Sequence, residues 1–393
     1  MACAMVLGQE SLVRVGALVM LLPLLGVASV ALRRVPLIPT RTVTPSVVTC
    51  GQPASVTLEL TTSGNGAAVP VLAEDRVPYA LGSRPRFVLE TGGPLAETEL
   101  DYPIRSDLRG RFTIGPLVVR VSDPFGLVEV TRSVPGTTEV VIVPRTVPLP
   151  SITLNGTHRG TGDNRPRAFS SGSAEDITVR EYRTGDDQRR IHWRSTARTG
   201  QLMVRHDEQP WQSRATVLLD NRAGSHRGQG PASSLETAVS HAASIIRHLG
   251  ERGYAVRLVT ADGAQFASTW HERGAATNTQ VLLEELAVVE ARELSTPVTT
   301  WLGEADPGIV VGVFGEVTEH DRAMLRRIRT AAPNALTVVV DVEAWAGRPQ
   351  GAAASALPRA LGWRAVTTGP GDGLEPAWLK LGPRGHQRQA GAQ

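Results

Sequence analysis

Residues 215–260 read ATVLLDNRAGSHRGQGPASSLETAVSHAASIIRHLGERGYAVRLVT, and this stretch decides the fold of the carboxy-terminal half. Two apolar runs, at 215–220 and 254–260, flank a segment at 233–252 whose apolar residues recur at helical spacing. Two strands joined through a helix in this way run parallel, because the crossover helix carries the chain back over one face of the sheet. The stretch therefore predicts a parallel sheet covered by helices.

The same alternation continues along the rest of the chain. Further elements are predicted as strands at 308–314, 335–341 and 363–368 and as helices at 278–292, 318–331 and 351–361. A turn signal at 261–263 precedes GAQFAST at 263–269, which predicts an antiparallel edge strand beside 254–260. A doubly wound α/β sheet whose third strand is antiparallel is the architecture of von Willebrand A-like domains, and we expect that fold here.

Asp220 ends the first predicted strand, at the edge of the sheet where doubly wound folds bind their ligands. Von Willebrand A domains with a metal-ion-dependent adhesion site carry an aspartate and two serines at alternate positions in the corresponding stretch. Here Arg222 and Gly224 stand in the serine positions, and a guanidinium beside Asp220 would repel a divalent cation. We therefore favour an ion pair between Asp220 and Arg222. A Mg²⁺ site at Asp220, with oxygens from Ser225 and Thr260, stays open as the alternative.

Residues 41–148 show no helical period, and short β-branched runs there are separated by Pro and Gly. The runs lie at 55–60, 69–74, 86–90, 97–105, 111–121, 127–134 and 138–143. Short strands at regular spacing are typical of a β-sandwich. We expect an all-β, sandwich-like domain with a structural role.

Residues 15–32, VGALVMLLPLLGVASVAL, carry no charged side chain. At about 1.5 Å per helical residue this stretch spans roughly 27 Å, close to the thickness of a bilayer core. Arg33, Arg34 and Arg41 follow it, and the positive-inside rule then places the bulk of the chain in the cytoplasm. We expect residues 1–40 to hold one transmembrane helix of a single-pass cell-membrane protein. A cleaved signal peptide and a buried core helix are the alternatives.

The composition limits the classes of function. With 41% apolar and 20% charged residues the chain is typical of globular proteins, and a formal charge of +3 is too small for a generally nucleic-acid-binding surface. Cys3 and Cys50 are its two cysteines, which excludes a disulfide framework and a four-thiolate zinc site. The sequence has neither GxxxxGK[ST] nor GxSxG, and we predict that it is not an enzyme.

An arginine-rich signature follows a linker at 149–175 that is dense in Gly, Ser, Pro, Thr and Asn. ITVREY at 177–182 alternates as a strand does, and Asp186 is a good N-cap for a helix at 187–197. The candidate partner-binding or structural residues of the signature are Arg180, Tyr182, Gly185, Asp186, Asp187, Arg190, His192, Trp193 and Arg194.

Three interpretations of the signature stay open. Its arginines, with His192 and Trp193 for stacking, could bind nucleic acid, although interleaved acidic residues weaken the positive field. Asp186, Asp187 and His192 could act as metal ligands or acid–base groups, although their spacing matches no known ligand set. In the third and favoured interpretation, paired charges and a buried Trp193 pin the linker to the following domain. An exposed indole would instead indicate a docking surface.

Residues 180–205, REYRTGDDQRRIHWRSTARTGQLMVR, closely resemble the signature of the domain of unknown function 58 family. Residues 109–132, RGRFTIGPLVVRVSDPFGLVEVTR, resemble the segment that precedes it in bacterial, especially actinobacterial, members. The resemblance extends over about 41–378 and implies membrane helices, a β domain, the signature and a von Willebrand A-like domain. Family members often carry two hydrophobic helices, whereas one is visible in this sequence. The expected parts are 1–40, 41–148, 149–175, 176–381 and a disordered tail at 382–393.

The resemblance also implies partners. Such proteins are commonly encoded beside MoxR-type AAA+ ATPases and transglutaminase-like membrane proteins, and are thought to act with them as a chaperone-like or assembly system. It supplies no catalytic residue and no cofactor. We therefore expect a membrane-anchored protein-interaction scaffold that works with a MoxR-type ATPase. The alternatives are a metal-dependent adhesion or enzymatic site at Asp220 and nucleic-acid binding through the signature.

Overall fold

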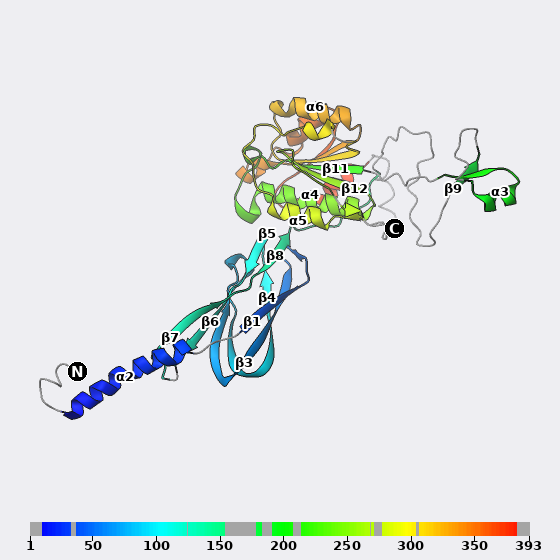
Figure 1. The fold of residues 1–393 in the computed structure, drawn as a ribbon. Coiled ribbons are helices and arrows are strands. Elements are labelled where there is room, and N and C mark those ends of the chain that lie inside the picture. Colours follow the sequence, from blue (N-terminus) through cyan, green and yellow to red (C-terminus); the bar gives the residue numbers. More distant parts are fainter. Residues whose placement is uncertain are drawn as a thin grey trace, which may run out of the picture. The chain divides into compact units, whose positions relative to one another are not determined.

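The structure is a computed structural model, and it describes residues 10–32, 37–123, 125–153, 178–182, 191–206, 214–267, 269–270, 277–303 and 306–382. Two compact units make up the chain, and Figure 1 shows their elements in sequence colours. The first consists of Met1–Thr146 with Gln229–Ala232 and Leu283–Glu290, and the second of Val147–Gly228, Ser233–Leu282 and Ala291–Gln393. Most of the expected linker and of the expected tail lies outside the described residues.

Helix α2 (Glu10–Leu32) opens the described part of the first unit and is apolar almost throughout. Its window Val13–Ala31 has 19 residues and a mean hydropathy of 2.1, and 11% of it is buried. A helix of this length and composition is long enough and apolar enough to cross a membrane. Pro23 lies inside α2, where a membrane-spanning helix tolerates it. The predicted apolar helix near the amino terminus is therefore confirmed.

Residues 37–143 of the first unit form two β-sheets. One has five strands, β1 (Leu37–Thr44), β3 (Pro53–Asp75), β4 (Arg86–Arg105), β6 (Leu117–Ser122) and β7 (Glu129–Val134). The other has three, β2 (Val48–Thr49), β5 (Gly110–Ile114) and β8 (Thr138–Val143). Alternating side chains of these strands turn inward and bury a shared hydrophobic core. The core includes Val56, Leu58, Leu60, Ile114, Leu117 and Ile142.

Several strand boundaries in this unit differ from the prediction. The long strands β3 and β4 each join two of the predicted runs, because their antiparallel ladder resumes after irregularities between Thr62 and Val69. The run predicted as one strand at 111–121 forms β5 and β6 instead. Gly115 separates them with a φ of +97°, and a Cβ there would lie 2.6 Å from the carbonyl oxygen of Gly136, so only glycine fits.

The second unit is built on a six-stranded sheet in the order β13-β12-β11-β16-β17-β18. The strands are β11 (Arg214–Leu219), β12 (Ala255–Thr260), β13 (Gln265–Ala267), β16 (Ile309–Phe314), β17 (Ala335–Val340) and β18 (Arg364–Thr368). Five of them run parallel, and β13 pairs antiparallel with β12 at the edge. The predicted α/β region and its antiparallel edge strand are therefore confirmed.

Helices cover both faces of this sheet, with α4 (Ser234–Glu251) and α6 (Arg322–Ala331) on opposite sides in Figure 1. Helix α4 begins at the predicted position because the Ser233 hydroxyl accepts a hydrogen bond from the Glu236 amide, at 3.3 Å. The shorter elements are α5 (Gln280–Val288), α7 (Ala356–Ala360), α8 (Leu374–Lys380), β14 (Thr269–Trp270) and β15 (Thr277–Asn278).

The start of the expected linker packs within the second unit. The Trp378 indole N–H of α8 donates to the carbonyl of Pro150, at 3.1 Å, and the Val147 amide donates to the Ser244 hydroxyl, at 3.0 Å. Trp378 is fully buried. The first residues of the expected linker are therefore tied to the α/β unit, which the Gly- and Ser-rich composition of that segment did not indicate.

The arginine-rich signature forms a small module of its own. Strand β9 (Thr178–Glu181) pairs antiparallel with β10 (Met203–His206), and helix α3 (Trp193–Thr199) lies between them in the chain. The predicted helix at 187–197 is present from Trp193 onward, but it begins later than predicted, while Asp186 and residues 187–190 lie outside the described residues. Ile191 forms a β-bridge with Val204, so the helix starts at Trp193 and His192 is the N-cap.

Candidate functional site

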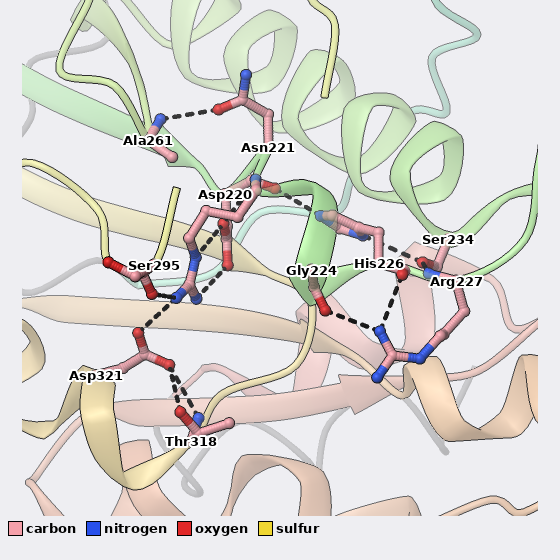
Figure 2. A network of polar contacts seen from close by, with 11 residues as sticks. Asp220, Asn221, Gly224, His226, Arg227, Ser234, Ala261, Ser295, Thr318 and Asp321 are labelled. Carbon is pink, nitrogen blue, oxygen red and sulfur yellow. Dashed lines mark hydrogen bonds and ion pairs between the residues drawn. The ribbon is translucent and has the colours of Figure 1, made fainter. Parts of the chain in front are cut away.

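Polar side chains converge where strands β11 and β16 end, side by side in the sheet. The connections from these two strands lead in opposite directions, so this edge is the switch point at which doubly wound sheets bind ligands. Asp220 follows β11 directly, and Asp321 comes from the turn that precedes α6. Both carboxylates accept hydrogen bonds from one guanidinium, that of Arg222, which is the unlabelled side chain between Asp220 and Asp321 in Figure 2.

The Arg222 guanidinium fills the space between the two carboxylates. Its Nε and Nη2 donate to Oδ1 and Oδ2 of Asp220 at 2.9 and 2.8 Å, which is a bidentate ion pair. Its Nη1 donates to Asp321 Oδ1 at 2.8 Å and to the carbonyl of Ser295 at 2.9 Å. The predicted pairing of Asp220 with Arg222 is confirmed, and Asp321 is a second partner that the sequence did not indicate.

All three charged groups are buried. The side chains of Asp220 and Asp321 have no exposed surface and that of Arg222 is 5% exposed. Burial acts to lower the pKa of Arg222, but the hydrogen bonds and charges of the two aspartates outweigh it and raise that pKa. The guanidinium is therefore permanently charged, and the three groups together carry a formal charge of one negative unit.

Asp321 is held in place by a capping box. Its Oδ2 accepts hydrogen bonds from the Thr318 amide at 2.9 Å and from the Thr318 hydroxyl at 3.4 Å. Its other oxygen, Oδ1, is thereby turned toward Arg222 (Figure 2). The residues TEHD at 318–321 fit the capping-box pattern of a hydroxyl followed three positions later by an acid, so this signal could have placed Asp321 at a helix start.

His226 closes the loop behind Asp220. Its Nε2 lies 2.6 Å from the carbonyl of Asp220, and its Nδ1 lies 3.1 Å from the Ser234 hydroxyl. A carbonyl only accepts, so Nε2 carries the proton and Nδ1 accepts from Ser234. Burial lowers the pKa of His226, which keeps the imidazole neutral. His226 therefore fixes the backbone at Asp220.

The same loop packs closely on the end of β16. A Cβ added to Gly315 would lie 2.1 Å from the carbonyl oxygen of Ser225 and 2.9 Å from His226 Cε1, so this approach requires glycine. On the other side, Asn221 Oδ1 accepts from the Ala261 amide at 3.0 Å, which ties the loop to the end of β12. We call the loops that carry Asp220 and Asp321 the Asp220 rim. The ends of the three adjacent strands β12, β11 and β16 hold it in place.

The metal ligands considered at Asp220 take other roles in this arrangement. Thr260 Oγ1 donates to Asp262 at 2.5 Å, and the Ser225 carbonyl accepts from the Glu316 amide at 2.8 Å. Within the described ranges, no group of three His, Cys, Asp or Glu side chains could hold a metal ion. Both oxygens of Asp220 and Oδ1 of Asp321 accept from Arg222, and Oδ2 of Asp321 accepts from Thr318.

The signature module presents a second candidate site. Trp193 is 69% exposed on α3, and Arg194 beside it is exposed as well. The exposed indole contradicts the interpretation in which a buried Trp193 pins the linker. His192 Nδ1 lies 2.8 Å from Ser195 Oγ and accepts from the Ser195 amide at 3.3 Å, so His192 serves as a helix cap.

The module holds α3 firmly against its hairpin. The His192 amide donates to the carbonyl of Met203 at 2.7 Å, and the Met203 amide donates to Thr196 Oγ1 at 3.0 Å. The Tyr182 amide donates to the carbonyl of Leu202 at 2.8 Å. Arg180 lies in β9, while Gly185, Asp186, Asp187 and Arg190 lie outside the described residues.

Residues 178–307 match the family model described as "Protein of unknown function DUF58". The match confirms the predicted resemblance for this part of the chain, which holds most of the signature, Asp220 and Arg222, while Asp321 lies beyond it. No curated protein matches the chain.

Two solved structures show a limited likeness. One is the alkylpurine DNA glycosylase AlkC of Pseudomonas fluorescens bound to DNA containing an abasic site analog, with 14% identity and a TM-score of 0.19. The match covers 27% of this chain and 30% of that one. The other is a CARDB domain from Pyrococcus furiosus in complex with di-metal ions, with 19% identity, a TM-score of 0.18, and 27% and 89% coverage. Similarity at these TM-scores carries no argument about fold or function.

Proposed function

Residues 178–307 match the DUF58 family model, and on this premise we propose that the chain is a membrane-anchored protein-interaction scaffold. In this proposal α2 is a single membrane span and the bulk of the chain faces the cytoplasm. The β-sheets of the first unit form a sandwich-like spacer. The second unit is a von Willebrand A-like domain, which the antiparallel position of β13 beside β12 supports.

The observation that carries the proposal is the exposure of Trp193. Burying a large apolar ring is favourable, so an indole left in water can gain free energy by binding a partner. Tryptophan is also among the residues that contribute most to binding at protein–protein interfaces. Leu202 is also exposed, on the turn that leads into β10. Because α3 is hydrogen-bonded to its hairpin, the ring is presented by a preorganised element.

The ion pairs of the Asp220 rim also support a protein-binding function. Both carboxylates are already neutralised in part by the Arg222 guanidinium, so binding there does not need an ion. A partner would meet a closed surface made by the loops after β11 and β16. This differs from an adhesion site at which a divalent cation bridges the two proteins.

The proposed partners are a MoxR-type AAA+ ATPase and a transglutaminase-like membrane protein, as the family resemblance implies. The test measures binding of a MoxR-type AAA+ ATPase to the full chain in lipid nanodiscs. Trp193→Ala is expected to weaken binding by about 2 kcal/mol, roughly 30-fold in Kd. Tyr79→Ala, which removes an exposed aromatic ring from the β unit, is the matched control and is expected to bind as the wild type does.

Equal affinity of the Trp193→Ala and wild-type chains would contradict the role of Trp193. The absence of any binding to the ATPase would contradict the partner itself.

Nucleic-acid binding is the second candidate, because Arg194 and Arg198 are exposed on the helix that carries Trp193. A base stacked on the indole with its phosphates near these arginines would follow the usual arrangement for single strands. Retention on single-stranded DNA that falls steeply with salt, and is lost in Trp193→Ala, would favour this function over the scaffold.

A further inference from the structure

The loop between β6 and β7 exposes two large apolar side chains. Phe125 is 62% exposed and Leu127 is 55% exposed. The loop is nevertheless ordered by Asp123, whose buried carboxylate accepts from the Phe125 amide at 3.0 Å and from the Val128 amide at 2.7 Å. Its charge is therefore satisfied by the backbone, and the apolar side chains are left at the outside.

The same loop lies against the carboxy-terminal turns of helix α2, within the first unit. A Cβ added to Gly26 would lie 3.2 Å from Val128 Cγ2 and 3.3 Å from Asp123 Oδ2, which is close packing. Four residues further along α2, the carbonyl of Val30 accepts from Arg132 Nη2 of β7 at 2.8 Å. Val30 is fully buried, unlike most of α2.

These contacts fix the depth of the loop if α2 crosses a membrane. Gly26 lies five residues before Ala31, where the apolar window ends, and five residues of helix measure about 7.5 Å. Elements that lie in the interface are buried about 5–10 Å into the boundary between headgroups and acyl chains. A loop packed on Gly26 is therefore at the level of that boundary and not in bulk water.

We propose that the turn at 125–128 inserts Phe125 and Leu127 into the membrane interface beside α2, as a second contact with the lipid surface. The inference rests on the membrane anchor of the proposed function and extends it. Aromatic and aliphatic side chains favour this depth, and the backbone hydrogen bonds to Asp123 leave fewer polar groups to desolvate there. With two contacts, the first unit is held at a defined tilt and does not swing freely on a single helix.

The test places spin labels on the full chain in nanodiscs of phosphatidylcholine and phosphatidylglycerol. Cys3→Ser and Cys50→Ser first remove the native thiols, and single cysteines then replace Phe125, Leu21 or Thr113. Leu21 is exposed in the middle of α2, and Thr113 is exposed on β5, at the end of the first unit away from α2 in Figure 1.

The label at Phe125 is expected to collide more often with oxygen, which concentrates in lipid, than with a water-soluble nickel complex. The ratio of oxygen collisions to nickel collisions at Phe125 is expected to be high, as it is for the label at Leu21. It is expected to be several times the ratio measured at Thr113. A ratio at Phe125 equal to that at Thr113, with Leu21 in lipid, would overturn the inference and leave the anchor intact. A Phe125 label shielded from both reagents would overturn it in favour of a protein contact. A water-exposed Leu21 would instead overturn the anchor.

Discussion

Each unit of this protein buries one arginine in a bidentate pair with an aspartate, but the two clusters differ in charge. In the β unit, Arg41 donates to Asp75 at 2.9 and 2.8 Å, and the Tyr102 hydroxyl donates to the same carboxylate at 2.7 Å. In the α/β unit, Arg222 lies between Asp220 and Asp321. The first cluster is neutral overall, while the second retains one negative charge.

The difference is one of construction, because the first cluster pairs one carboxylate with one guanidinium and the second pairs two carboxylates with one guanidinium. Arg41 also donates to the carbonyl of Gly136 at 3.0 Å, so its cluster joins strands β1, β3 and β4 to the turn before β8. Burial and the neighbouring Asp75 raise the pKa of Tyr102, so its hydroxyl stays protonated and donates. At the rim Asp321 accepts from the Thr318 amide and hydroxyl, but both aspartates share one guanidinium, which lies where a cation would bind.

The largest expected effect is that of Arg222→Ser in the presence of a chelator. The substitution leaves two buried carboxylates facing each other, so we expect the free energy of unfolding to fall by about 5 kcal/mol, the upper end for a broken buried pair. Chemical denaturation of the full chain measures it. A loss below about 1 kcal/mol is typical of an exposed ion pair, and it would contradict the claim that Arg222 stabilises two buried carboxylates.

Arg41→Met is expected to cost less, about 3 kcal/mol, because one carboxylate remains and Tyr102 still donates to it. The double variant Arg41→Met, Asp75→Asn removes both charges and is expected to recover part of that loss. If Arg41→Met proved more damaging than Arg222→Ser, the distinction between the clusters would fail. The same denaturation series supplies both values.

His241, a buried histidine of helix α4, is expected to make the stability of the α/β unit depend on pH. Burial lowers the pKa of His241 to about 4, and its Nδ1 finds no hydrogen-bond partner among the residues that the structure describes. The unfolded chain binds this proton near pH 6.5, so the stability is complete above that pH and is lost as the pH falls toward 4, by up to about 3 kcal/mol. His241→Leu is expected to flatten this part of the stability curve, whereas His320→Gln, at an exposed position, is expected to leave it unchanged.

Persistence of the full pH slope in His241→Leu would contradict this prediction, because groups other than His241 would then cause it.

The smallest effect on stability is expected for Trp193→Ala, within about 0.5 kcal/mol, because the ring is mostly exposed. The same substitution is expected to weaken partner binding. A large loss of stability would show instead that the ring is buried in solution, and would restore the structural interpretation of the signature. Thermal denaturation in parallel with the binding assay distinguishes the two.

Local patterns were sufficient to predict the elements that depend on nearby residues. The strand, helix and strand at 215–260 follow from the spacing of their apolar residues. The pairing of Asp220 with Arg222 could be predicted because the two residues are only two positions apart. Asp321 is 99 residues from Arg222 and reaches it only through the pairing of β11 with β16. A distance of that kind is set by sheet topology and cannot be read from local composition.

Tertiary pairing also explains why the helix begins later than predicted. Asp186 after a glycine has the local features of an N-cap, but Ile191 pairs with Val204 and delays the helix to Trp193. The favoured interpretation of the signature required a buried Trp193, whereas the ring is 69% exposed on α3. For the helix start, the bridge between Ile191 and Val204 outweighed the local preference.

Calorimetric titration of Mg²⁺ or Mn²⁺ into the full chain tests most directly whether Arg222 holds the place of a cation at the rim. The account predicts no binding heat for the wild type, binding by Arg222→Ser, and loss of that binding in Arg222→Ser, Asp220→Ala. At an ion concentration 100 times its Kd, binding would also restore about 2.7 kcal/mol of stability to Arg222→Ser. Wild-type binding that Asp220→Ala abolishes would contradict the account, because an ion would then share the rim with the guanidinium.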